Sequence, residues 1–371
     1  MYCVIFCLLI DYVPQPNLQS VVLNTLDPLK PENLNKFYFI VCLINMKEKI
    51  ECIGVLTSGG DNPGLNPCIR AVVRTAIQKG FEVMGIHKGF EGLMNGEIER
   101  MDTRSVSNIL GRGGTILGTA RCPRFHDPKG RQEALRMLNR RGIDGIVIIG
   151  GNGSLRGALE LSRMGFPTMG IPGTIDNDVN GTDISIGVDT ALNTIIDAID
   201  KIKDTASSHN RAFLIETMGR NSGYLALSSS IAGGAELVLI PEVKITFDEI
   251  VRTIRSAYLG GKSHCIIVIA EGWKPGTREL AEKLNKLEDE LGFSVRVTQL
   301  GHVQRGGGAS AFDRILATRM GAAAVKELVS GNAGNMIGWI NGIALTPLEE
   351  AVAYDKRISE DLYELAKIMA K

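Results

Sequence analysis

Short apolar runs rich in β-branched residues alternate along this chain with longer stretches whose apolar residues recur at helical spacing. The runs lack strict polar alternation, which is typical of strands covered on both faces. We expect strands at residues 52–57, 81–86, 145–150, 167–171, 212–217, 236–240, 265–270 and 295–300. Between Gly187 and His209 the spacing predicts an amphipathic helix of about six turns. The alternation therefore predicts βαβ units, that is, an α/β fold with mainly parallel sheets.

Length and charge limit the possible functions. The 371 residues suffice for two such domains. Lys+Arg and Asp+Glu balance at 41 each, so no net charge attracts the chain to nucleic acid or to an anionic membrane. The seven cysteines show no C-x-x-C pair and no zinc-ligand spacing. We therefore expect a reduced, cytoplasmic protein that acts on small molecules.

Residues 1–49 differ from the rest of the chain. They hold two short apolar runs separated by a proline-containing polar segment, and each run is shorter than the ~20 residues that cross a bilayer. The first run also lacks the basic region of a secretory signal. Met46 stands just before the well-patterned part, so we expect 1–49 to be an extension, either disordered or a translation artefact.

Three segments, 57–66, 112–121 and 149–157, are dense in glycine. The first and third follow an expected strand and open a helical stretch, where free N–H groups and the helix dipole favour phosphate. Tight strand-to-helix turns would have the same composition, but three segments joined by Arg121 favour a nucleotide. Near-matches to the dinucleotide fingerprint ("GNGSLRG") and to the Walker A loop ("GGKS") have the wrong spacing. They support neither a nicotinamide enzyme nor a P-loop ATPase.

The stretch "PGTIDND", residues 172–178, places Asp176 and Asp178 just after an expected buried strand. Ligands of parallel α/β sheets bind beyond the carboxyl ends of the strands. Phosphoryl transfer to a hydroxyl needs a carboxylate base, oxygen ligands for magnesium and cations for the transferred charge. The two aspartates can supply the first two, although Asp and Asn also build Asx turns.

Further polar groups follow later apolar runs, in "ETMGRNSG", "AEGW" and "LGHVQRGG". An arginine fork can bind two oxygens of a phosphate at once, although a single arginine is more often a solvated surface residue. As a set, these residues favour a phosphorylated substrate. They are Arg220, Glu271, His302 and Arg305, with Arg211 and Arg296 at nearby strand starts.

In this order, "GVLTSGGDNPGLN", "GGNGS", "PGTIDND", "ETMGRNSGYLAL" and "LGHVQRGG" resemble 6-phosphofructokinase of the bacterial ATP-dependent type, from about Cys52 to about Gly342. The resemblance implies two Rossmann-like α/β/α domains with the active site in the cleft between them. It implies transfer of the γ-phosphoryl of MgATP to the 1-hydroxyl of D-fructose 6-phosphate, a committed step of glycolysis. The implied domains are 50–187 plus 304–354 for ATP and 188–303 plus 355–371 for fructose 6-phosphate.

The resemblance also implies roles for individual residues. Asp176 would be the general base, flanked by Thr174 and by Asp178, which would help to hold Mg²⁺. The implied ATP site comprises Gly60, Arg121, Cys122, Gly151, Asn152, Gly153 and Ser154, and Arg121 and Arg220 would also act in catalysis. The implied sugar contacts are Met218, Gly219, Arg220, Glu271, His302 and Arg305, with Arg211 and Arg296 from a neighbouring subunit of a homo-oligomer, commonly a tetramer.

Some positions differ from the family pattern, and others distinguish its ATP-dependent members from its pyrophosphate-dependent ones. Pyrophosphate-using relatives carry an aspartate and a lysine where this chain has Gly153 and Gly173, so both glycines favour ATP. Asn152 replaces a magnesium-associated aspartate, so we expect a raised magnesium requirement.

The implied effector site is altered as well. Thr103 and Gly260 replace cations of that site, and Asn108 replaces an aspartate. We therefore expect weak or altered allosteric control. The residues that match or approximate the effector ligands are Arg70, Arg74, Lys203, Glu236 and Lys262.

Two alternatives stay open on sequence alone. One is a pyrophosphate-dependent phosphofructokinase. The other is a catalytically weak paralogue that regulates a partner subunit, for which Asn152 is the only sequence hint.

Overall fold

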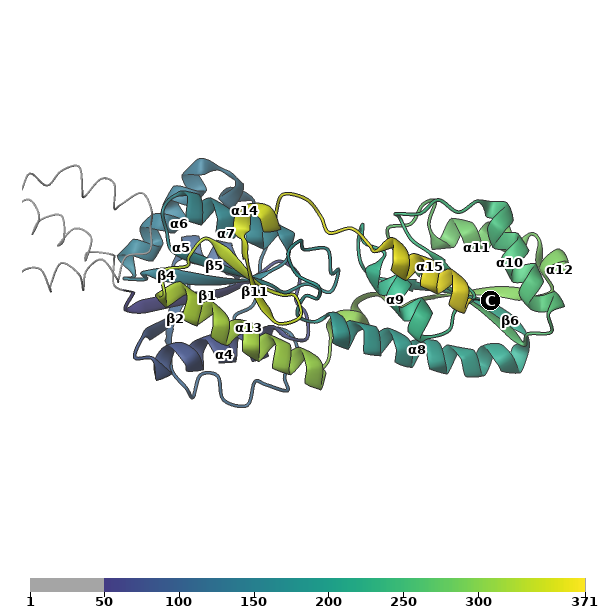
Figure 1. The fold of residues 1–371 in the computed structure, drawn as a ribbon, viewed down its shortest axis with the longest axis horizontal. Helices are drawn as coiled ribbons and strands as arrows, with labels where there is room; N and C mark the ends of the chain where they lie inside the picture. Colours follow the sequence, from purple (N-terminus) through teal and green to yellow (C-terminus); the bar gives the residue numbers. More distant parts are fainter. Residues whose placement is uncertain (1–49, 371) are drawn as a thin grey trace, which may run out of the picture. The chain divides into compact units, whose positions relative to one another are not determined.

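The computed structural model describes residues 50–370 (Figure 1). The expectation for residues 1–49 lies outside the described residues. None of the described helices is long and apolar enough to cross a membrane.

A seven-stranded sheet has the order β11-β10-β5-β4-β1-β2-β3. Its inner strands pair in parallel, whereas β3 and β11 pair antiparallel at the two edges. The strands are β1 (Cys52–Ser58), β2 (Glu82–Ile86), β3 (Ile98–Met101), β4 (Gly145–Gly150), β5 (Thr168–Pro172), β10 (Asn335–Trp339) and β11 (Ile343–Pro347).

Helices cover both faces of this sheet (Figure 1). On β4, Val147 and Ile149 belong to the apolar cluster shared with α4 (Leu65–Gln78) and α13 (Ala311–Val329). The alternate residues Ile146 and Ile148 belong to the opposite cluster, which includes side chains of the other covering helices. Both faces are buried, which explains the unbroken apolar runs in the sequence. Those helices are α5 (Gly89–Asn95), α6 (Pro128–Arg140), α7 (Asn152–Arg163) and α14 (Leu348–Ala351).

A second, all-parallel sheet has the order β7-β8-β6-β9. On β6, Phe213 and Ile215 pack with α8 (Val188–His209), α9 (Tyr224–Ala232) and α15 (Glu360–Met369). Ala212 and Leu214 belong to the cluster on the other face. The strands are β6 (Arg211–Thr217), β7 (Leu237–Leu239), β8 (His264–Ala270) and β9 (Ser294–Gln299), and the helices of the other face are α10 (Phe247–Leu259), α11 (Thr277–Asn285) and α12 (Glu288–Leu291). Two short 3-10 helices, η1 (Pro123–His126) and η2 (Gly301–Arg305), complete the described elements.

The sequence predicted the buried strands better than the edge strands. All eight expected strands are present with small shifts of their ends, and the long helix begins at Val188 and ends at His209. The strands β3, β10 and β11 were not predicted. β3 and β11 lie at the sheet edges and are partly exposed, so their sequences lack a continuous apolar run.

Candidate active site

The carboxyl ends of β1, β4 and β5 lie side by side, which brings the glycine-rich loops and the acidic turn to one edge of the sheet. Ser58 is in register with Gly150, and Gly150 with Pro172. The N–H of Gly173 donates to the carbonyl of Gly150 over 2.9 Å. Two of the glycine-rich segments and the acidic turn therefore lie next to each other.

The loop after β4 leads directly into a helix. Gly151 caps α7, whose first residues are Asn152 and Gly153, so their backbone N–H groups lie at the positive end of the helix. A methyl group built on Gly153 would meet nothing within 4 Å. The start of this helix therefore has the free N–H groups and the open space that a bound anion needs.

The acidic turn is held by its asparagine. Asn177 has φ +49°, its Oδ1 accepts from the N–H of Ser185 at 3.0 Å, and its Nδ2 donates to the carbonyl of Asp183 at 3.1 Å. The neighbouring carboxylates are less fully bonded. Oδ1 of Asp176 and Oδ1 of Asp178 are buried and have no hydrogen-bond partner within residues 50–370. Asn177 therefore braces the turn through bonds to residues six and eight positions further along the chain, and neither Oδ1 atom of the two aspartates takes part in holding the turn.

Asp176 is a buried carboxylic acid residue. Its residue is 4% exposed, and its backbone N–H donates to Thr174 Oγ1 over 3.2 Å. Burial, reinforced by the charge of Asp178, raises the pKa of Asp176 to about 6, and the charges of Arg220 and Arg305 oppose that rise. Burial also raises the pKa of Asp178. A carboxylate whose pKa lies near the working pH can accept a proton and release it again.

Arg220 faces Asp176 from the ends of the second sheet. Its Nε lies 3.5 Å from Asp176 Oδ2, and its backbone N–H donates to Glu271 Oε1 over 2.9 Å. Thr217 and Ala270, the last residues of β6 and β8, are in register, so the loops that carry Arg220 and Glu271 begin next to each other.

Met218, another expected sugar contact, is positioned by a residue that the sequence did not single out. Its N–H donates to Oε1 of Gln304 over 3.1 Å, and Nε2 of Gln304 donates to the carbonyl of Gly301 over 2.9 Å. Gln304 is fully buried. It lies inside the "LGHVQRGG" motif, but its side chain is uncharged, so the sequence did not indicate a role for it.

Arg305 lies against the loop after β1. Its Nη1 donates to the carbonyl of Asp61 over 2.9 Å, and the residue is 9% exposed. A methyl group built on Gly60 would lie 2.4 Å from that Nη1. Glycine at position 60 therefore allows the guanidinium to approach the backbone.

Several predicted site residues make no contact with the acidic turn. Arg121 and His302 are exposed and form no ion pair with any residue of 50–370. Cys122 is half-buried near Met94, and burial together with Glu91 raises the pKa of its thiol to about 11. The thiol therefore stays protonated at neutral pH.

Arg211 and Arg296 lie on the neighbouring strands β6 and β9. Arg211 is in register with Ser294 and Phe213 with Arg296, so both arginines lie on the same face of the sheet. β9 is an edge strand, and Arg296 is exposed there. Neither arginine contacts the acidic turn in the described part of this single chain.

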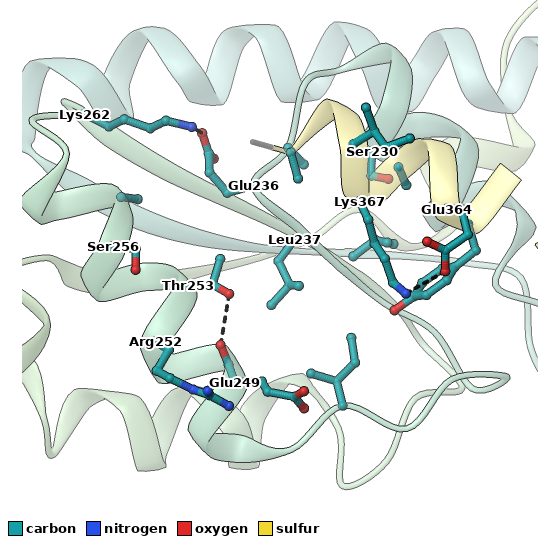
Figure 2. A pocket seen from close by; sticks show the side chains of 18 residues that line it. Ser230, Glu236, Leu237, Glu249, Arg252, Thr253, Ser256, Lys262, Glu364 and Lys367 are labelled. Atoms are coloured by element: carbon teal, nitrogen blue, oxygen red, sulfur yellow. Dashed lines mark hydrogen bonds and ion pairs between the residues drawn. The ribbon is translucent and has the colours of Figure 1, made fainter. Parts of the chain in front are cut away.

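The expected effector residues form two groups. Lys262 Nζ lies 3.0 Å from Glu236 Oε1, and Glu236 Oε2 accepts from the N–H of Ile266 at 2.7 Å. Both line a cavity of about 770 Å³ between β7, α10 and α15 (Figure 2). Lys203 lies nearby, 3.5 Å from a methyl group built on Gly234. Arg70 and Arg74 instead belong to α4, which packs on the seven-stranded sheet.

Three unpartnered oxygens test whether a cation fits the acidic turn. They are Oδ1 of Asn152, Asp176 and Asp178, all buried and without a hydrogen-bond partner inside the described range. Carboxylate and amide oxygens are the ligands that Mg²⁺ prefers. No group of three Asp, Glu, His or Cys side chains that could hold a metal occurs in residues 50–370, so a metal here would also need oxygens from a bound phosphate.

Comparison of the sequence with known proteins identifies similar proteins. The family model described as Phosphofructokinase matches residues 52–328. A protein of Clostridium acetobutylicum named ATP-dependent 6-phosphofructokinase is 52% identical over 323 residues, covering 87% of this chain and 100% of the relative. One of the same name from Bacillus pumilus is 50% identical over 317 residues, covering 85% and 98%.

Solved structures give the same result for the fold. Phosphofructokinase from Saccharomyces cerevisiae aligns with a TM-score of 0.76 and 37% identity, over 86% of this chain and 48% of the yeast chain, so this chain spans about half of that length. A pyrophosphate-dependent phosphofructokinase from Marinobacter aquaeolei aligns with a TM-score of 0.75 over 86% and 92% of the two chains, but at 21% identity it supports the fold alone. The matched range, the near-complete coverage of the bacterial relatives and the shared fold establish that this chain belongs to the phosphofructokinase family.

Proposed function

We propose that this chain transfers the γ-phosphoryl group of MgATP to the 1-hydroxyl of D-fructose 6-phosphate, giving fructose 1,6-bisphosphate and ADP. The observation that carries the proposal is Asp176. This buried carboxylate has a free oxygen and a raised pKa, and its other oxygen lies 3.5 Å from Nε of Arg220. The two bacterial relatives, which are 52% and 50% identical to this chain, are named for this activity, and the chain covers nearly their whole length.

In this mechanism Asp176 accepts the proton of the sugar hydroxyl as the oxygen attacks phosphorus. Arg220, 3.5 Å from Asp176, and the exposed Arg121 would supply positive charge to the transferring group. Thr174 holds the backbone of Asp176 through the 3.2 Å hydrogen bond. When bound with the nucleotide, Mg²⁺ supplies charge neutralisation at the β- and γ-phosphates, and Asp178 and Asn152 are the residues that would hold it.

Nucleotide and sugar would occupy opposite sides of Asp176. The nucleotide side would be formed by the start of α7, together with Gly60 and Cys122. The phosphate of the sugar would bind His302 and Arg305, while Glu271 and the backbone at 218–220 hold the sugar. We assign ATP to 50–187 plus 304–354 and fructose 6-phosphate to 188–303 plus 355–371.

The choice of ATP over pyrophosphate rests on two glycines. Gly153 opens on empty space, which leaves room for the rest of a nucleotide beyond the transferred phosphates. Gly173 is closely packed, since a methyl group there would lie 3.1 Å from Leu65 and 3.2 Å from Ile149. A lysine at 173 would have to displace this packing.

A complete substrate site would need a second subunit. Arg211 and Arg296 lie on a sheet face that ends at the edge strand β9, and within one chain neither contacts the acidic turn. We propose that they reach the sugar phosphate of a neighbouring subunit in a homotetramer. The free cysteines of the described part, Cys52, Cys68, Cys122 and Cys265, fit a reducing compartment such as the cytoplasm.

A donor-swap assay tests the proposal. The purified full chain is given fructose 6-phosphate and Mg²⁺ with either ATP or pyrophosphate, and fructose 1,6-bisphosphate is measured through coupled aldolase. We expect turnover with ATP and little with pyrophosphate. Turnover with pyrophosphate alone would establish the other donor, and no turnover with either would leave a regulatory paralogue.

A further inference from the structure

Asn152 makes contacts that an aspartate could not make. Its Nδ2 donates to the carbonyl of Asp178 over 3.2 Å and to Oδ1 of Asp355 over 3.0 Å. An amide nitrogen has two N–H groups, and these two acceptors use both of them. The amide orientation is thereby fixed, and Oδ1 of Asn152 remains as a buried acceptor without a partner in the described chain.

Asp355 is brought to this point by the segment that returns from α14 toward α15. The N–H of Lys356 donates to the carbonyl of Asp178 over 2.8 Å, and Lys356 Nζ donates to the carbonyl of Asp183 over 2.5 Å. These two bonds hold the backbone at the end of the acidic turn and five residues beyond it. The carboxylate of Asp355 thus stands next to the start of α7, a position that favours negative charge.

The charge balance of the site changes once Asp355 is included. On sequence alone, the neutral side chain at 152 predicted weaker metal binding. The structure instead shows a carboxylate hydrogen-bonded to that side chain, with Arg156 Nη2 at 3.9 Å as its nearest cation. Arg156 and Asp355 are each 59% exposed in their side chains, so this ion pair offsets little of the carboxylate charge.

We propose that Asn152 and Asp355 act as one unit toward the nucleotide-bound magnesium: Asn152 offers its carbonyl oxygen, and Asp355 orients that amide and supplies the negative charge missing at position 152. This inference rests on the proposed function, because it assumes a metal–nucleotide complex at the acidic turn. Asp355 is a positioning residue in this account. Partners that orient a metal ligand typically contribute 10- to 100-fold to metal affinity.

The test uses Mn²⁺ as the probe and ADP as the nucleotide, with no sugar and no turnover. Electron paramagnetic resonance measures free Mn²⁺ in mixtures of ADP with the full chain, and calorimetry measures binding of metal-free ADP. The variants are Asp355→Asn, Asn152→Asp and the exchanged pair Asn152→Asp/Asp355→Asn. Glu349→Gln is the matched control, because it removes a carboxylate that pairs with Arg163 at the other end of α7, 2.6 Å away.

We expect Asp355→Asn to weaken Mn²⁺ retention about tenfold while metal-free ADP binds as before. Asn152→Asp should weaken it as well, because two carboxylates then face each other where the amide now bridges. The exchanged pair should recover to within about threefold of the unaltered chain, since one carboxylate and one amide are restored. Glu349→Gln should weaken Mn²⁺ retention by less than about twofold.

The inference is overturned if Asp355→Asn behaves like Glu349→Gln, or if the exchanged pair shows the product of the two single losses. Equal losses for metal-free and metal-bound ADP would also overturn it, because they indicate a purely structural role. Failure of the unaltered chain to bind ADP at all would instead remove the proposed function itself.

Discussion

Replacing Asp176 by asparagine should make the protein more stable while it removes the base. Asp176 is 4% exposed, and one of its oxygens has no hydrogen-bond partner within residues 50–370, so the folded state pays to keep the side chain ionised. The pKa rises from 3.8 to about 6. At about 1.4 kcal/mol per pH unit, this corresponds to ~3 kcal/mol.

The sign follows from proton binding. The folded pKa lies above the unfolded one, so between pH 3.8 and about 6 the folded state binds more protons, and stability falls as the pH rises through that window. The penalty is absent below the window and complete above it. A neutral asparagine carries no such penalty at any pH.

Thermal unfolding of the two proteins checks this. At pH 7.5 we expect Asp176→Asn to unfold at a temperature higher by roughly 4–10 °C, and at pH 5 we expect about half of that gain. Asp313→Asn is the comparison: burial raises the pKa of that carboxyl as well, but its two oxygens accept hydrogen bonds from Gly187 and Thr190 that an amide only partly replaces, so we expect no net gain. A lower unfolding temperature in Asp176→Asn, or a gain that does not change with pH, would refute the reasoning.

Three other predictions follow from the structure. The kcat/KM for fructose 6-phosphate should fall tenfold per unit as the pH drops below about 6, because Asp176 must be ionised; a pH profile that stays flat down to pH 5 would contradict this. Gly153→Asp should raise the KM for ATP by tenfold or more, since its side chain enters the open space beside the helix start; steady-state kinetics measure it, with Gly153→Ala as the control, because a methyl group at that position meets nothing within 4 Å. Asp313→Ala should destabilise the fold by about 2–4 kcal/mol, because Gly187 N, Thr190 N and Thr190 Oγ1 lose their acceptor; urea unfolding measures it, and a loss below about 1 kcal/mol would show that these bonds matter little.

The sequence predicted the features that depend on local pattern. Strands buried on both faces are continuous apolar runs, so β1, β4, β6 and β8 were found with nearly correct ends. The acidic turn was also found, because two carboxylates directly after a buried strand are hard to explain by packing. Whether their carboxylates only held the turn could not be decided from sequence; in the structure Asn177 braces it, through bonds to Asp183 and Ser185.

What the sequence missed depends on contacts between distant segments. Asn152 and Asp355 are 203 positions apart, and nothing near Asp355 marks it as part of a site. Gln304 is neutral, so its hydrogen bond to Met218 had no signature. Asp313 looks like an ordinary first-turn helix residue, yet it accepts hydrogen bonds from the start of α8. Such roles follow from tertiary packing alone.

The central claim is that Asp176 removes the proton from a sugar hydroxyl that attacks ATP. Its most direct test is the rate of fructose 1,6-bisphosphate formation by the unaltered chain and by Asp176→Ala at pH 8, with saturating fructose 6-phosphate and MgATP. We predict a loss in kcat of about 10²- to 10⁴-fold, with ADP binding unchanged. A variant that retained kcat within about threefold would contradict the assignment of Asp176 as the base.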